Sequence, residues 1–205
     1  MLKILGRVSS INVRKVLWTC AELGLPFERE DWGAGFRSTQ EPAFLALNPN
    51  AQIPVLVDGD FTLWESNSIC RYLAAQYGQG RLLPPAPQAR AWVEQWMDWQ
   101  ATDLNSSWRV PFMALVRGQP TAPEAVQAGV ATWNRQMALL DAQLARSGAW
   151  VLGAEFTLAD VVLGVSALRW QRAPIAHAEL PAVQAYLARL AARPAFVAQG
   201  DQGQA

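Results

Sequence analysis

The first third of the chain alternates short apolar runs with helical stripes of apolar residues. Leu2–Leu5 is an apolar run that ends at Gly6, which predicts a short buried strand, and Phe27–Asp31 predicts a second one. Between them, apolar residues recur at helical spacing, namely Val13, Val16, Leu17, Cys20 and Leu23. The pattern is typical of a strand–helix–strand unit, in which the loop of residues 7–12 follows the end of the first strand.

Two short apolar runs on either side of Asp58-Gly59 predict a β-hairpin. Ile53-Pro54 precedes its first strand, and because proline has no backbone N–H, that edge of the sheet stays open there. Glu65-Ser66 follows the hairpin, and Ser66 begins a helix predicted over Ser66–Tyr77. An open edge beside a helix N-terminus suits a small extended peptide that carries a carboxylate.

The second part of the chain shows helical periods alone. It follows residues 79–88, a segment rich in Gly, Pro and Gln that reads as a linker. With a short helix at Glu41–Leu47, the first part is a small α/β domain, residues 1–78, and the second is an all-α domain, residues 89–200. The helices predicted in the second domain are Arg90–Val116 with a kink at Pro111, a stripe from Val126 to Leu144, a buried helix opened by Thr157-Leu158-Ala159-Asp160 as a capping box, and Pro181–Ala192.

Composition excludes several classes of protein. The 205 residues contain 17 acidic and 17 basic side chains, which argues against a nucleic-acid partner because such binders carry a basic surface. No apolar run approaches the ~20 residues of a membrane span, and the first residues do not resemble a secretion signal. One histidine and two cysteines without metal-ligand spacing make a metal site an unfavoured hypothesis, so no metal is expected.

Six segments occur together in an order that identifies a resemblance. They are Ser9-Ser10-Ile11-Asn12, residues 22–28, residues 48–54, Glu65-Ser66, Phe156–Asp160 and Arg193–Phe196. In this order they resemble the cytosolic glutathione transferases, and the loop with two serines is most similar to the bacterial, serine-type branch. The resemblance covers essentially the whole chain. It implies a thioredoxin-like N-terminal domain followed by an all-helical C-terminal domain, a homodimer, a cytoplasmic location and glutathione as co-substrate.

The resemblance assigns most of the glutathione contacts to the hairpin region. Ile53 would pair its backbone with the cysteinyl part of glutathione, next to a cis peptide bond at Pro54. Glu65 and Ser66 would hold the γ-glutamyl end, and Ser66 would offer both its hydroxyl and a helix N-terminus to the carboxylate. Gln52 matches a further side chain that reaches the tripeptide. For Ser66 an ordinary helix cap remains the alternative reading.

The glycyl end of glutathione is where this sequence departs from the family. Thr39 and Gln40 stand where the serine-type branch often has a histidine and a lysine. Arg37 is a nearby positive charge that could replace them, with a solvated loop arginine as the alternative.

The implied chemistry is ionisation of the glutathione thiol. A free thiol has a pKa of about 8.5, so a hydroxyl and a helix N-terminus must lower it to give thiolate near neutral pH. Ser10 matches the family's catalytic serine, and Ser9 is the alternative. Asn12 could donate a second hydrogen bond or act chiefly as a helix cap. The loop contains no tyrosine, and Cys20 lies too far along the helix to replace the serine.

The electrophile would bind against the tryptophan-rich helix of the second domain. Asn105, Trp108, Arg109 and Phe112 follow helical spacing and are expected to line a hydrophobic substrate pocket. Trp108 and Phe112 could equally belong to the core. Arg109 is the expected contact for an anionic group of the substrate or for glutathione, with an interdomain salt bridge as the alternative.

The sequence thus predicts an enzyme, a glutathione transferase that conjugates glutathione to small hydrophobic electrophiles, as in detoxification. A glutathione-dependent peroxidase, disulfide reductase or isomerase would use the same thiolate. A module of this fold that binds ligands without turnover is the alternative from another class.

Overall fold

In the computed structural model, which describes residues 1–201 and 203, four short strands form one mixed sheet. They are β1 (Leu2–Leu5), β2 (Phe27–Glu30), β3 (Val55–Asp58) and β4 (Phe61–Trp64). Their order is β2-β1-β3-β4, with β1 parallel to β2 and antiparallel to β3. Ile4, at the centre of the sheet, pairs with Arg29 on one side and with Leu56 on the other. The predicted strand–helix–strand unit and hairpin are therefore present.

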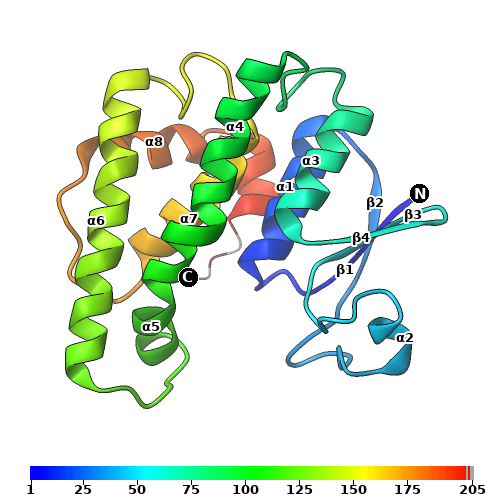
Figure 1. Cartoon of the computed structure of the whole chain (residues 1–205), viewed down its shortest axis with the longest axis horizontal. Coiled ribbons are helices and arrows are strands. Elements are labelled where there is room, and N and C mark those ends of the chain that lie inside the picture. The colour runs from blue at the N-terminus through cyan, green and yellow to red at the C-terminus, as the bar shows by residue number, and fades with distance from the viewer. Residues whose placement is uncertain (202, 204–205) are drawn as a thin grey trace.

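Three helices complete the sheet domain: α1 (Ile11–Leu23), α2 (Pro42–Leu45) and α3 (Ser66–Tyr77). Helices α1 and α3 pack together and lie between the sheet and the helical domain (Figure 1). Helix α3 has the predicted bounds. Helix α2 is shorter than the predicted Glu41–Leu47, because Pro42 occupies its first turn and the chain turns again at Asn48.

The second half of the chain is all-helical. Its elements are α4 (Pro87–Trp99), the π-helical turn η1 (Gln100–Leu104), α5 (Asn105–Leu115), α6 (Pro123–Ser147), α7 (Leu158–Arg172), α8 (Pro181–Ala191) and the π-helical turn η2 (Phe196–Gly200). The helix predicted over Arg90–Val116 is interrupted at the π-helical turn η1, which the sequence analysis did not expect, and Pro111 lies buried inside α5. The kink at Pro111 stays a prediction.

Helix α7 is the centre of the second domain, as its uniformly apolar sequence predicts. Every residue from Leu158 to Trp170 is buried. The capping box at its start is present, with Asp160 accepting hydrogen bonds from the backbone N–H groups of Val151 and Thr157, each at 2.9 Å. Burial raises the pKa of Asp160 to about 6.

The two halves share a continuous hydrophobic core, because α1 packs against α7 and η2. Trp18 of α1 lies over Gly164 of α7, where a Cβ would come within 3.0–3.1 Å of the tryptophan ring. Helix α3 ends at Tyr77 and α4 begins at Pro87. The division into residues 1–78, 79–88 and 89–200 stays a prediction.

Candidate functional site

The residues before β3 form one wall of a small pocket. The Ile53–Pro54 peptide bond is cis, as the resemblance implies. Asn48 is buried and closes the turn that precedes it: its Nδ2 donates to the Gln52 carbonyl at 2.8 Å, and its Oδ1 accepts from the Asn50 N–H at 3.0 Å. These two bonds fix the backbone that carries Gln52 and Ile53 into the pocket.

The junction between β4 and α3 forms the opposite wall. Glu65 has a φ of +73°, a left-handed conformation that is unfavourable for a residue with a side chain and is often found at functional sites. It is exposed, whereas the next residue, Ser66, is buried as the first residue of α3. The junction therefore presents a carboxylate beside a helix N-terminus, where backbone N–H groups attract anions.

Most of the predicted glutathione contacts meet in a single pocket of about 120 Å³. Thr39 and Gln40 are predicted residues that do not line it, and neither Ser9 nor Ser10 does. Asn48, Asn50 and Trp64 line it although the sequence analysis did not single them out. The whole lining is Asn12, Asn48, Asn50, Gln52, Ile53, Pro54, Trp64, Glu65 and Ser66.

The serine loop lies directly beside this pocket. A Cβ on Gly6 would come 2.5 Å from Val13 Cγ2 and 3.2 Å from Ile53 Cβ, so only glycine lets the loop pack against Ile53. Ser10 is the N-cap residue of α1, and its carbonyl accepts the Arg14 N–H at 3.0 Å. Among the described residues, the hydroxyls of Ser9 and Ser10 have no hydrogen-bond partner, so either can donate to a ligand.

The loop after β2 offers no free cation to the pocket. The Arg37 guanidinium lies 3.9 Å above the Trp32 ring and donates to Glu41 at 3.0 Å, so its charge is engaged. The Gln40 side chain is exposed, and its backbone N–H donates to Ser38. The assignment of Thr39 and Gln40 to the glycyl carboxylate stays a prediction.

Two buried cations lie behind the pocket. Arg14 and Lys15 are the fourth and fifth residues of α1 and are 1% and 3% exposed. Cations are unfavourable near a helix N-terminus, and this first turn contains no acidic residue. That inverted charge order was a sequence signal for an anion site, and the sequence analysis missed it.

Lys15 connects the two domains beneath Ser66. Its Nζ donates to Gln100 Oε1 at 2.7 Å and to Asn67 Oδ1 at 3.2 Å, and Gln100 in turn donates to Ser166 of α7. Burial lowers the pKa of Lys15 to about 8, while the nearby carboxylate of Glu65 favours the charged form.

Two of the predicted electrophile residues on α5 contact a different arginine from the expected one. Trp108 and Phe112 pack edge to face, and the guanidinium of Arg169 from α7 lies 4.5 Å and 4.3 Å from their ring centres. Arg169 is buried, whereas Arg109 is exposed. Asn105 is half-buried at the start of α5. Burial, and to a smaller extent the positive charge of Arg14, lowers the pKa of Arg169 to about 9.

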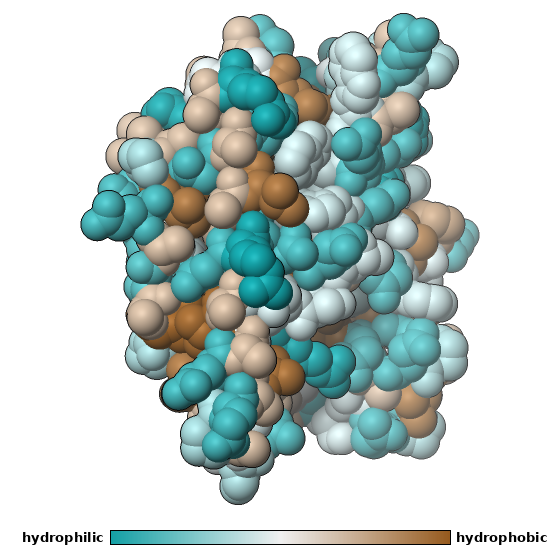
Figure 2. All heavy atoms as spheres, turned by 60° about the vertical axis from the view of Figure 1, so that its left-hand side comes forward, coloured by the Kyte–Doolittle hydropathy of each residue, from teal (hydrophilic) through white to brown (hydrophobic). Residues whose placement is uncertain are grey.

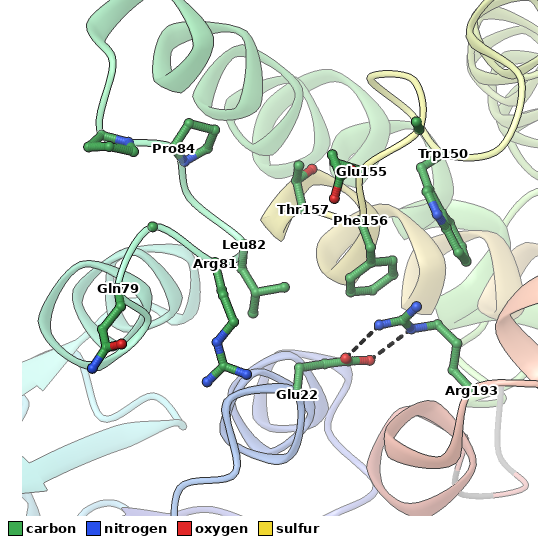
Figure 3. Close-up of a pocket in the computed structure, with 13 residues that line it drawn as sticks. Glu22, Gln79, Arg81, Leu82, Pro84, Trp150, Glu155, Phe156, Thr157 and Arg193 are labelled. Atoms are coloured by element: carbon green, nitrogen blue, oxygen red, sulfur yellow. Dashed lines mark hydrogen bonds and ion pairs between the residues drawn. The ribbon is translucent and has the colours of Figure 1, made fainter.

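A larger pocket, of about 820 Å³, lies at the other end of α1 and contains none of the predicted residues (Figure 3). At its floor, Glu22 and Arg193 form a salt bridge of 2.6 Å, with Phe156 and Trp150 beside them. These two charges therefore satisfy each other.

Comparison with known proteins identifies the chain. Models of the glutathione S-transferase N-terminal and C-terminal domains match residues 9–76 and 123–189. Glutathione S-transferase GstB of Escherichia coli is 40% identical over 199 residues, covering 95% of each chain. The chain belongs to the glutathione S-transferase family. The predicted fold class and the prediction of a transferase are confirmed.

Solved structures agree. The theta-class glutathione S-transferase of Xanthomonas axonopodis pv. citri, solved with glutathione bound, superposes with a TM-score of 0.93 at 38% identity and covers 100% of this chain and 99% of its own. Glutathione S-transferase 3 of Zea mays is 36% identical over 205 residues, which is 95% of this chain and 91% of that protein.

Two further findings concern the described residues of this transferase. They contain no group of three or more His, Cys, Asp or Glu side chains placed to hold a metal ion. None of their helices is both long and apolar enough to cross a membrane. On the face in Figure 2, hydrophobic side chains form small separate patches between hydrophilic ones.

Proposed function

We propose that this transferase binds glutathione in the 120 Å³ pocket, ionises its thiol with Ser10, and conjugates it to small hydrophobic electrophiles. The observation that carries the proposal is that Ser10 is the N-cap residue of α1, in the loop that packs on Ile53 through Gly6, and that its hydroxyl has no hydrogen-bond partner among the described residues. The chain would then belong to the serine-type branch of its family.

The pocket walls fit the γ-glutamyl and cysteinyl parts of the tripeptide that the sequence predicts as ligand. The Glu65 carboxylate accepts hydrogen bonds from the γ-glutamyl ammonium group, and Ser66 with the N-terminus of α3 binds the neighbouring carboxylate. The backbone of Ile53 pairs with the cysteinyl residue, and Gln52 lines the same wall. This arrangement directs the sulfur toward the serine loop.

Activation follows from the charges around the first turn of α1. A hydroxyl donating to the sulfur, the α1 N-terminus and the buried cations Arg14 and Lys15 all favour the thiolate over the thiol. Each unit by which they lower the thiol pKa corresponds to about 1.4 kcal/mol. The thiolate then forms a C–S bond with the electrophile, whose leaving group departs with the bonding electron pair, and the thiol proton passes to solvent.

The test is a spectroscopic titration of bound glutathione, in which thiolate absorbance is followed against pH. We expect Ser10→Ala to raise the thiol pKa by about one unit or more and to lower kcat/KM at neutral pH about tenfold. Ser9→Ala is the matched control and should leave both values unchanged. A wild-type protein without thiolate below pH 8 would remove the transferase mechanism, and a loss in Ser9→Ala alone would move the role to Ser9.

The same titration separates the alternatives. A binding module without turnover holds glutathione but gives no thiolate, whereas peroxide reduction, disulfide reduction and isomerisation use the same thiolate on other acceptors. Turnover of an aromatic halide compared with an organic peroxide and a mixed disulfide then decides among the reactions.

We further propose a cytoplasmic homodimer. Phe61 and Trp64 of β4 and Trp92 of α4 are exposed by 45%, 39% and 62%, which is unusual for side chains of this size. Sedimentation should give twice the monomer mass, and Trp92→Glu should shift it toward the monomer. A wild-type protein that sediments as a monomer would overturn the dimer.

A further inference from the structure

The electrophile side of the site contains a buried positive charge that no acidic side chain among the described residues neutralises. We propose that Arg169 is an anion-binding residue of the electrophile pocket, so that this enzyme prefers small planar electrophiles that carry a carboxylate. The inference rests on the proposed function, because it assigns a substrate class to the same site.

The first step is the absence of a partner. Arg169 is 4% exposed, yet among the described residues neither a carboxylate nor another hydrogen-bond acceptor reaches its guanidinium. Its Nε is completely enclosed. A buried charge is strongly unfavourable unless it is paired, so an unpaired guanidinium indicates a ligand that supplies the missing anion.

The second step is that Asp201, the carboxylate that acts on Arg14, is already engaged. Asp201 accepts two hydrogen bonds from Arg172, at 2.6 Å and 2.8 Å, and this contact lowers the pKa of Asp201. The charges of Arg14 and Arg117 act on Arg169, that of Arg169 acts on Lys15, and all of them are positive. Among the described residues, the surroundings of Arg169 are therefore electropositive.

The third step is a second unsatisfied donor. The indole Nε1 of Trp108 is enclosed and has no acceptor among the described residues, although its ring lies 4.5 Å from the Arg169 guanidinium carbon. The guanidinium stacked on the indole ring places both donors in one small region, and a carboxylate offers two oxygen acceptors for them. The rings of Trp108 and Phe112 supply flat apolar surfaces for the rest of a planar molecule.

The fourth step is proximity to the reacting sulfur. The positive charge of Arg169 lowers the pKa of Lys15, and that of Arg14 lowers the pKa of Arg169, so the three side chains lie close together. Arg14 is one helical turn from Ser10. Helices α1 and α7 pack together over this region. A carboxylate bound at Arg169 would therefore lie near the N-terminal part of α1, the part that begins at Ser10.

The experiment compares two matched substrates, a nitro-activated chlorobenzoate and the corresponding chlorobenzamide. In both, the glutathione sulfur forms a bond to the ring carbon and chloride leaves with the electron pair, so only the charge of the distant group differs. We expect wild type to prefer the benzoate in kcat/KM and Arg169→Met to reduce that preference roughly tenfold to a hundredfold. Arg169→Lys should retain part of the preference, since it keeps the charge but not the planar fork.

Two further arginine variants make the assignment specific. Arg135→Met removes an exposed arginine of α6 and should leave the benzoate preference unchanged. Arg109→Met tests the arginine that the sequence favoured, and a loss of the preference there but not in Arg169→Met would overturn the proposal. An unreactive nitrobenzoate should inhibit wild type more strongly than nitrobenzamide, and Arg169→Met should abolish the difference.

The outcomes separate this inference from the proposed function. If wild type turns over neither substrate and forms no thiolate, the proposed function fails. If benzamide turnover is normal and Arg169→Met leaves the benzoate preference intact, only the anion site fails. An equal loss on both substrates, or a raised KM for glutathione alone, would mean that Arg169 is structural or holds glutathione, and would also overturn the proposal.

Discussion

Helix α1 has an arginine packed on aromatic rings at each of its ends, and the two arginines differ in one respect. At the C-terminal end, Arg193 stacks on Phe156 at 3.8 Å, and its Nε and Nη2 donate to the two oxygens of Glu22 at 3.0 Å and 2.6 Å. At the N-terminal end, Arg169 lies over Trp108 and Phe112 and has no acceptor among the described residues.

The presence or absence of an acidic partner distinguishes a structural contact, at Arg193, from a binding site, at Arg169. The Glu22 pair is complete, since the indole of Trp18 also donates to Glu22 at 2.8 Å, and it connects the end of α1 to the segment after α8. The guanidinium of Arg169 has no anion bound to it among the described residues. A folded protein keeps such a local conflict where function requires it, so the larger pocket next to Glu22 is the less informative of the two.

The largest expected effect is the loss of stability when the salt bridge between Glu22 and Arg193 is broken. Glu22→Gln removes the charge that neutralises Arg193, and we expect it to lower the free energy of unfolding by about 2 kcal/mol, the low end for such pairs because Arg193 is partly exposed. For a protein of this size that corresponds to a drop of roughly 4–8 °C in Tm. Urea unfolding and a thermal scan measure it.

Activity provides the control for this prediction. Glu22 lies at the far end of α1, so kcat/KM per folded molecule should remain that of wild type. A double-mutant cycle with Arg193→Met isolates the pair. A Glu22→Gln variant that stays as stable as wild type, or one that loses turnover while folded, would contradict the assignment of a structural role to the C-terminal end of α1 and a functional role to its N-terminal end.

The second prediction concerns Lys15, the buried cation at the N-terminal end that can lose its proton. Burial lowers its pKa from 10.5 to about 8 in the folded protein. Between these values the unfolded chain binds the extra proton, so the Lys15 contribution to stability rises with pH by about 1.4 kcal/mol per pH unit. The stability of wild type minus that of Lys15→Met should therefore increase above pH 8.

The difference between the two proteins is needed because the cysteines act in the opposite direction. Burial raises the pKa of Cys20 to about 12 and that of Cys70 to about 11, so the unfolded chain loses these protons first and stability falls as pH rises above about 9. Both proteins contain these thiols, so the effect of Cys20 cancels in the difference. The effect of Cys70 cancels only in part, because the charge of Lys15 lowers the pKa of that thiol. Parallel stability curves would show that the proton on Lys15 is not released in this range.

The comparison also shows which parts of the molecule a sequence can predict. The hairpin and the helix from Ser66 to Tyr77 follow from neighbouring residues, since turn chemistry and periodicity act over a few positions, and both are present. The π-helical turn at residues 100–104 escaped prediction because one inserted residue barely changes the apolar period. Lys15 pairs with Gln100 across 85 positions, and Arg169 of α7 meets Trp108 of α5 only in the folded chain. No local pattern encodes such contacts.

The smallest expected effect is also on the free energy of unfolding, and its sign is opposite to that of Glu22→Gln. Arg169→Met replaces an unpaired buried charge with an apolar side chain of similar length, so we expect the free energy of unfolding to stay equal or to rise by up to about 1 kcal/mol. Arg193→Met, its counterpart at the other end of α1, should destabilise, because it leaves Glu22 buried without a cation. Urea unfolding of the two variants under the same conditions measures whether their free energies of unfolding change in these opposite directions. A clear loss of stability in Arg169→Met would mean that its contacts with Trp108 and Phe112 hold the helices together, and the two ends of α1 would then be alike.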